Sequence, residues 1–250
     1  MSVINYGRGQ FRVQDKIKQV FELLAIRVQD LSDVPENNDW LGDGEREVLA
    51  GLRFPRRRND WRLGRWTAKQ AILSLLDTET DLSLFEIRAA ADGAPEAFLQ
   101  NAPAGIAISI SHSNGRGFCA ALPRKSHGDS TTENIHEIGC DIEQLEPRSD
   151  LLTTDFFTAE EIELVRKTDS ENKILITNLI WSAKESVLKA LREGLRRDTR
   201  SVSIQPELSP AGLPRFENEW SRWTGRCLQT SRAFHGRWRA DSRFVYTVAF

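Results

Sequence analysis

Apolar residues recur every three or four positions in several segments of the chain, which predicts amphipathic helices. Such helices are expected over residues 43–54, 59–76, 157–167 and 174–195. In the second of these, Asp60 is the expected N-cap, and the apolar face carries Ala68, Ala71, Ile72, Leu75 and Leu76. The third opens with a capping box formed by Thr158 and Glu161, and the fourth should stop near Gly194.

Strand-like alternation or short apolar runs mark other segments. They predict strands over residues 84–89, 106–113, 117–122, 135–143 and 242–250. The sequence NGRG, residues 114–117, joins two of them and is the strongest hairpin signal in the chain. The segment VFELLAIRV, residues 20–28, fits a helix at least as well as a strand, so the residues alone leave it open.

Helices and strands are mixed without strict βαβ alternation, which predicts an α+β fold. The polar, turn-rich stretch 123–134 fits either a linker between domains or a long hairpin loop.

Composition narrows the class of protein. With 40% hydrophobic and 28% charged residues the chain is typical of a soluble globular protein, and its net charge of -2 does not fit a general nucleic-acid binder. The three cysteines, Cys119, Cys140 and Cys227, have no metal-type spacing and indicate a reducing compartment. No signal peptide and no run of 18 apolar residues are recognised, so we expect a cytoplasmic protein that does not enter the membrane.

Acidic residues stand where a buried strand is predicted. Asp141 and Glu143, in IGCDIE, are two positions apart and therefore share one face of a strand. In the helix 174–195, Trp181, Glu185 and Lys189 also share a face. Each set alone fits an ordinary solvated surface, but three carboxylates on a strand and a facing helix suit Mg²⁺, which would offset their repulsion.

A second charged feature lies upstream and is strongly basic. Its members are Arg53, Arg56, Arg57, Arg58, Arg62, Arg65 and Lys69. Such a run is usually a solvated face and sometimes a nucleic-acid patch, although guanidinium groups also suit small phosphate ligands.

The motifs IGCDIE (138–143) and WSAKESVLKA (181–190), taken together, resemble the signature pair of the 4′-phosphopantetheinyl transferases. SISHS (109–113) and RRRNDWRLGRWTAKQAI (56–72) resemble motifs of the larger, Sfp-type members. The sequence DGAP is a departure, because many members have a lysine where Ala94 stands.

This resemblance implies a fold of two similar α+β halves that form a pseudo-dimer in one monomeric chain. Residues 1–122 would be the N-terminal half with a basic helix that contacts coenzyme A, 123–134 the connecting segment, and 135–250 the half with the metal-binding and catalytic motifs. It also favours a strand for residues 20–28. The implied reaction moves the 4′-phosphopantetheine arm of coenzyme A to a serine of an apo acyl or peptidyl carrier protein, as in polyketide or nonribosomal-peptide biosynthesis, and releases 3′,5′-ADP.

The resemblance also assigns roles. Mg²⁺, for which Mn²⁺ is a candidate substitute, would be held by Asp141, Glu143 and Glu185, and catalysis would fall to Glu185 and Lys189. The residues expected to contact coenzyme A are Arg53, Arg58, Arg65, Ser111, His112, Asp141, Lys184 and Lys189.

Two other readings stay open. A Mg²⁺-dependent phosphohydrolase or nuclease also uses an Asp-x-Glu pair with a distant Glu. The other alternative is a non-catalytic protein that uses the fold as a scaffold, although the complete set Asp141, Glu143, Glu185 and Lys189 argues against it. Cys140 is predicted to be a core residue on the strand face opposite Asp141.

Overall fold

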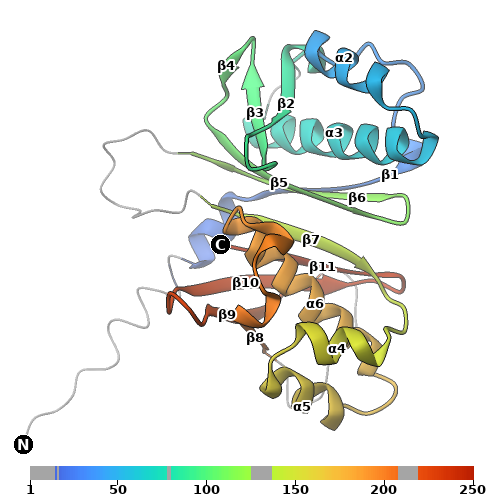
Figure 1. Cartoon of the computed structure of the whole chain (residues 1–250). Helices are drawn as coiled ribbons and strands as arrows, with labels where there is room; N and C mark the ends of the chain where they lie inside the picture. Colours follow the sequence, from blue (N-terminus) through green and yellow to red (C-terminus); the bar gives the residue numbers. More distant parts are fainter. Residues whose placement is uncertain (1–14, 16, 78–79, 125–136, 208–218) are drawn as a thin grey trace, which may run out of the picture.

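The computed structural model describes residues 15, 17–77, 80–124, 137–207 and 219–250. It consists of two α+β halves stacked along their sheets, with the helices of each half on the outer side (Figure 1). The segment expected to connect the halves falls largely on residues 125–136, which lie outside the described residues. No helix in the described part of the chain is long and apolar enough to cross a membrane.

The N-terminal half places a long helix against two small sheets. Strands β1, β6 and β5 form one antiparallel sheet in that order, and β2, β3 and β4 form the other. The elements are β1 (Ala25–Asp30), α2 (Asp43–Gly51), α3 (Pro55–Leu76), β2 (Phe85–Ala89), β3 (Pro95–Leu99), β4 (Ala102–Pro103), β5 (Ile106–Ser113) and β6 (Arg116–Pro123). Short 3-10 turns cover Leu31–Asp33 and Leu82–Leu84.

The C-terminal half packs a long helix on one five-stranded antiparallel sheet, in the order β7-β11-β10-β9-β8. Its elements are β7 (Gly139–Gln144), α4 (Asp150–Phe156), α5 (Ala159–Lys167), α6 (Lys173–Ala190), β8 (Val202–Pro206), β9 (Ser221–Cys227), β10 (Ala233–Ala240) and β11 (Phe244–Ala249). Short 3-10 turns cover Gly194–Arg196 and Thr199–Ser201.

A buried lysine–glutamate pair recurs in the two halves. In the first, Lys69 on α3 lies 2.5 Å from Glu45, which accepts hydrogen bonds from the backbone of Gly42, at the start of α2, and from the backbone of Ile87 in β2. In the second, Lys184 on α6 lies 2.9 Å from Glu161.

The second pair has the same surroundings as the first. Glu161 closes the capping box of α5 and accepts a hydrogen bond from the backbone of Ile204 in β8. Each lysine also donates to two backbone carbonyl groups. The two halves are therefore similar in detail as well as in outline.

The halves meet through β5 and β7. The backbone N–H of Cys140 donates to the Ser109 hydroxyl (2.9 Å), and the amide of Asn114 donates to Gln144 (2.7 Å). An apolar cluster drawn from both halves lies beneath these contacts, and its buried members are Val20, Ala107, Phe118, Ala120, Leu122, Ile138, Cys140, Ile142, Phe244, Tyr246 and Val248. A shared core of this size ties the halves into one body.

Most expected elements are present with small shifts, and the hairpin is confirmed. Asn114 and Gly115 both have positive φ angles (45° and 78°), as a two-residue turn of the I′ type requires. The capping box of Thr158 and Glu161 is also confirmed.

Several expectations were wrong. Residues 20–28 are part helix and part strand, because 20–23 are helical and β1 begins at Ala25. Asp60 does not cap a helix, since α3 begins at Pro55, where the ring suits the first turn. Leu76 is 45% exposed instead of buried. Helix α6 ends at Ala190, before Gly194.

The repeated pair gives a stability prediction. Replacing Lys184 with Met should lower the free energy of unfolding by about 3–5 kcal/mol, because Glu161 would stay buried without a partner. Urea unfolding measures the effect, and Lys69→Met should show a similar loss. Lys167→Met, which removes an exposed pair with Glu163, is the control and should change little. A Lys184→Met variant as stable as the control would contradict a structural role for this pair.

Candidate active site

Helix α6 lies unusually close to strand β7. A Cβ atom built on Gly139 would stand 1.8 Å from the backbone oxygen of Ser186 and 2.7 Å from the backbone nitrogen of Ala190. Only glycine fits at that distance. The contact brings the predicted helix face directly opposite the two strand acids.

The face of α6 that carries Trp181, Glu185 and Lys189 meets β7 as expected. The Lys189 ammonium donates to Asp141 Oδ1 (2.7 Å) and to the backbone oxygen of Cys140 (3.1 Å). About two helical turns before Lys189, Trp181 Nε1 donates to Glu143 Oε1 (3.0 Å). The helix therefore contacts both acids of the strand.

Asp141 is the most enclosed of the three acids, with 4% of its surface exposed. Its Oδ1 accepts hydrogen bonds from Lys189 and from the hydroxyl of Ser111 on β5 (2.7 Å). Its Oδ2 is buried and has no hydrogen-bond partner among the described residues. A buried carboxylate oxygen without a donor is costly, and it is an acceptor available to a cation or a ligand.

Glu143 is held from the other side by Arg148, whose Nη2 donates to Oε2 (2.6 Å). The guanidinium is fixed in turn by the buried amide of Asn178, since Arg148 Nε donates to Asn178 Oδ1 (2.7 Å). Burial, and then repulsion from Asp141, raise the pKa of Glu143, and Arg148 opposes them. The repulsion between the two strand acids is thus offset by two cations of the chain itself, Lys189 and Arg148.

Glu185 lies between these two pairs. Burial, followed by repulsion from Asp141 and Glu143, raises its pKa to about 7, while Lys189 acts in the opposite direction. No hydrogen bond holds its carboxylate among the described residues. A carboxylate that takes up a proton near neutral pH suits a general base.

The donors present suit Mg²⁺ in their chemistry, because Asp141 Oδ2 lacks a partner and Glu143 and Glu185 supply further hard oxygens. As placed, however, no three acidic, His or Cys side chains of the described residues converge as a metal-binding group. Binding a metal between these acids would therefore require their side chains to turn towards it.

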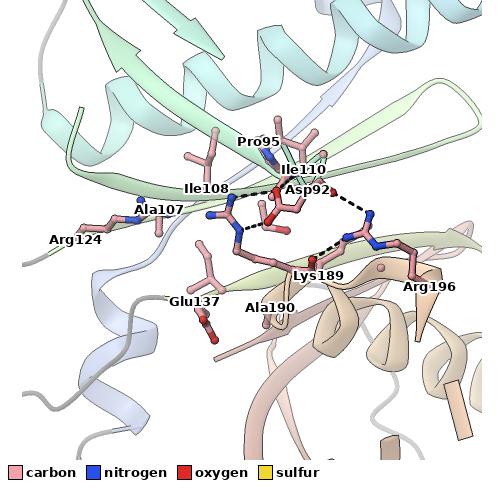
Figure 2. A pocket seen from close by; sticks show the side chains of 16 residues that line it. Asp92, Pro95, Ala107, Ile108, Ile110, Arg124, Glu137, Lys189, Ala190 and Arg196 are labelled. Atoms are coloured by element: carbon pink, nitrogen blue, oxygen red, sulfur yellow. Dashed lines mark hydrogen bonds and ion pairs between the residues drawn. The ribbon is translucent and has the colours of Figure 1, made fainter. Parts of the chain in front are cut away.

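A cavity of about 250 Å³ opens beside Lys189, between the halves (Figure 2). Its N-terminal wall is the β2–β3 turn and β5, and its C-terminal wall includes Ile138 and the end of α6. A wider, more open cleft of about 650 Å³ adjoins it and shares Gly93, Pro95 and Ile110 with it. Together they form a hollow that leads from the basic end of α3 to Lys189.

The residues expected to contact coenzyme A are spread over different surroundings. His112 and Arg65 line the open cleft, and Lys189 lines the cavity. Arg58 donates to the backbone oxygens of Leu49 and Leu52, at the end of α2. Arg53 is exposed, and neither it nor Arg58 is among the residues that line the cleft, whereas Arg56 and Arg57 are.

Lys184 needs a correction. It is fully buried and forms the ion pair with Glu161 on the side of α6 that packs against α5 and β8. A phosphate cannot reach this ammonium without breaking the core, so Lys184 does not bind coenzyme A in this structure. Burial lowers the pKa of Lys184, and Glu161 opposes this shift.

Several residues of the site were not foreseen. Arg148 and Asn178 hold Glu143 in place, but in the sequence they belong to no motif that distinguishes them from ordinary polar residues. Arg192 and Arg196 line the cavity just beyond α6, where the sequence predicted more helix. Trp61, beneath the Arg65 guanidinium at 4.5 Å, lines the cleft.

Cys140 has the properties of a core residue. It is fully buried, and its thiol donates to the backbone oxygen of Ser109 (3.0 Å). Burial raises its pKa to about 11, so the thiol stays protonated near neutral pH. A buried, protonated thiol does not suit a nucleophile, in keeping with a core role.

Two solved structures overlap part of this chain. A holo-(acyl-carrier-protein) synthase from Bacillus anthracis, in complex with CoA (3′,5′-ADP), is 23% identical and overlaps 41% of this chain and 96% of its own, with a TM-score of 0.37. The holo-[acyl-carrier-protein] synthase of Thermotoga maritima is 20% identical and overlaps 51% of this chain and 77% of its own, with a TM-score of 0.35. These overlaps are partial and add nothing to the fold described above.

Sequence comparison is more informative. The 4′-phosphopantetheinyl transferase HetI of Nostoc sp. is 30% identical over 163 residues, which cover 64% of this chain and 63% of that relative's length. Residues 137–247, which include β7 and α6, match the 4′-phosphopantetheinyl transferase superfamily. Residues 137–247 are therefore similar to that superfamily, and the chain spans less than two thirds of the length of this relative.

Proposed function

We propose that this chain is a 4′-phosphopantetheinyl transferase that acts on carrier proteins as a cytoplasmic monomer. The observation that carries the proposal is that Asp141 and Glu143 meet the face of α6 with Glu185 and Lys189, and that Lys189 lines a cavity between the halves. These four residues lie in the segment that matches the superfamily. Coenzyme A is the co-substrate in this proposal.

In the proposed reaction, the hydroxyl oxygen of a carrier serine attacks the phosphorus that bears the pantetheine arm. A bond forms between that oxygen and the phosphorus, and the pyrophosphate P–O bond breaks. Glu185 takes the serine proton, and 3′,5′-ADP leaves with the bonding electrons. The raised pKa of Glu185 supports this role, because a base works best when its pKa lies near the working pH.

Lys189 would contact the pyrophosphate, since it lines the cavity and is already drawn to Asp141. Mg²⁺, held by Asp141, Glu143 and Glu185, would neutralise charge that grows on the phosphate oxygens. His112 and Arg65, which line the open cleft, would receive the 3′-phosphate, while Ser111 would keep Asp141 in position.

The contacts of the acids argue against a two-metal phosphohydrolase. Lys189 and Arg148 already pair with Asp141 and Glu143, so little anionic charge is left for two cations.

A direct assay separates these functions. With coenzyme A, Mg²⁺ and an apo acyl or peptidyl carrier protein, the carrier should gain the mass of one phosphopantetheine arm, read by intact-protein mass spectrometry. Carriers from fatty-acid, polyketide and nonribosomal-peptide synthesis should be tried. Hydrolysis of coenzyme A with no mass gain on any carrier would favour the phosphohydrolase instead.

Glu185→Gln tests the general base. The variant keeps the shape of the side chain but accepts no proton, so kcat should fall by about 10²–10⁴-fold while coenzyme A still binds in calorimetry. Glu171→Gln, an exposed acid before the start of α6, is the matched control and should keep its kcat. If Glu185→Gln has a normal kcat at raised Mg²⁺ concentration, Glu185 is a metal ligand and not the base.

Dephospho-coenzyme A tests the open cleft. If His112 and Arg65 receive the 3′-phosphate, this analogue should bind about ten-fold or more weakly than coenzyme A, since each charge-assisted hydrogen bond is worth about 1.5–3 kcal/mol. His112→Ala should reduce the difference between the two ligands. Equal affinities of the wild type for both ligands would place the 3′-phosphate elsewhere.

A further inference from the structure

A group of charged side chains crosses the cavity between the halves and has no part in the proposed chemistry. Arg192, just after α6, donates from Nε to Asp92 Oδ2 (2.7 Å) and from Nη2 to Asp92 Oδ1 (3.1 Å). Its Nη2 also donates to Glu96 (3.0 Å), and Arg196 donates to the backbone oxygen of Asp92 (3.0 Å). Figure 2 shows the contacts that end on Asp92. We call Asp92, Glu96, Arg192 and Arg196 the clasp.

The backbone of Arg192 indicates that the clasp is specific. Arg192 has a φ of 57°, in the left-handed region, and its N–H donates to the backbone oxygen of Lys189 (2.9 Å). This is the position after a helix where glycine is the usual residue. An arginine adopts this conformation only where its surroundings determine it, and here the side chain is fixed by two acids of the other half.

Asp92 is equally well fixed on the N-terminal side. Its Oδ1 accepts a hydrogen bond from the backbone of Ala94 (3.0 Å), so the same carboxylate organises the β2–β3 turn and binds Arg192. The hydrogen bond from Arg192 is the largest cause that lowers the pKa of Asp92 to about 2, which keeps the carboxylate ionised. The clasp therefore joins one wall of the cavity to the other.

Lys189 lies at the end of α6, three residues before Arg192. It lines the same cavity as Ile108 and Ile110 of the opposite wall. Because the clasp joins the end of α6 to the β2–β3 turn, it also sets the distance between Lys189 and the wall formed by Ile108 and Ile110.

An isolated surface ion pair would not have this effect, because such pairs are weak and mobile. The clasp differs in three respects. It is bidentate, it joins residues 100 positions apart in the chain, and Arg192 and Asp92 are only 30% and 33% exposed.

We propose that Arg192 and Asp92 are a positioning pair that sets the spacing of the two halves around the cavity, and with it the affinity for the ligand held there. The ligand, coenzyme A, rests on the proposed function. Neither residue takes part in the transfer step.

Arg192→Gly is the first test. Glycine is favoured at a positive φ, so the variant should lose the clasp without losing stability. The Kd for coenzyme A, measured by calorimetry, and its KM should rise about 10-fold, within the usual range of coupling between sites, while kcat changes little. A purely structural role would instead lower the midpoint of thermal unfolding and leave the Kd unchanged.

Reversing the pair tests positioning against direct contact. The double variant Asp92→Arg, Arg192→Asp restores an ion pair with its charges exchanged, and it should recover part of the affinity, because it loses the Ala94 contact and places the new aspartate near Glu96. Arg166→Ala removes another bidentate pair, with Glu163 within α5, and should not affect the Kd. If Arg192→Gly binds coenzyme A as the wild type does, or if the reversed pair recovers nothing, the proposal is wrong.

A ligand-free measurement separates this inference from the proposed function. Spin labels on Glu47→Cys and Glu160→Cys report the distance between the halves, because both positions are exposed and the native Cys119, Cys140 and Cys227 are buried. Arg192→Gly should broaden or lengthen that distance, and an unchanged distribution overturns the clasp. If the wild type does not bind coenzyme A, the proposed function fails, and this distance alone decides the clasp.

Discussion

Each half of the protein is organised around one buried ammonium group. Lys69 and Lys184 neutralise the glutamates that cap the preceding helices, and through them each lysine connects two helices to an outer strand of its sheet. A buried charge requires its partner at a fixed distance and in a fixed direction, so these pairs determine how α3 and α6 are rotated about their axes. With Lys184 turned into the core, the adjacent face of α6 presents Glu185 and Lys189 to β7, and the glycine at 139 allows the close approach.

The two halves share this frame, by which we mean the buried lysine–glutamate pair and the helices and strand it connects. They differ in the polar residues on the adjacent face of the long helix. When the two buried lysines are superimposed in sequence, Trp66 corresponds to Trp181, Gln70 to Glu185 and Ser74 to Lys189. Strands β1 and β7 also correspond, since each pairs over six residues with the last strand of its half. Arg27 then takes the place of Asp141, and it donates to Ser74 (2.6 Å) as Lys189 donates to Asp141. The N-terminal half thus has the contact without the acids.

The sequence predicted what depends on neighbouring residues. The hairpin at Asn114 and Gly115, the capping box of α5 and the shared face of Trp181, Glu185 and Lys189 follow from local spacing alone. Helical spacing does not say which face is buried, and for that reason Lys184 was assigned to a ligand. The partners of Arg58 are backbone carbonyls of another helix, which no side-chain pattern reveals, and its contact with coenzyme A stays a prediction. The pairing of Arg192 with Asp92 joins residues 100 positions apart and had no local signal. Strands β9 and β10 were missed because arginines alternate with their buried residues and reduce the apolar signal.

The repeated frame has a consequence for how the sequence is able to change. In an assembly of identical subunits, any substitution appears at every copy of a site. A substitution that improves one copy therefore cannot occur without changing the others. Here the two copies lie in one chain and vary separately. Arg27, Gln70 and Ser74 are released from the demands placed on Asp141, Glu185 and Lys189, while the buried lysine pair keeps both halves in register. Mutational tolerance should therefore be unequal at corresponding positions, high in the first half and low in the second.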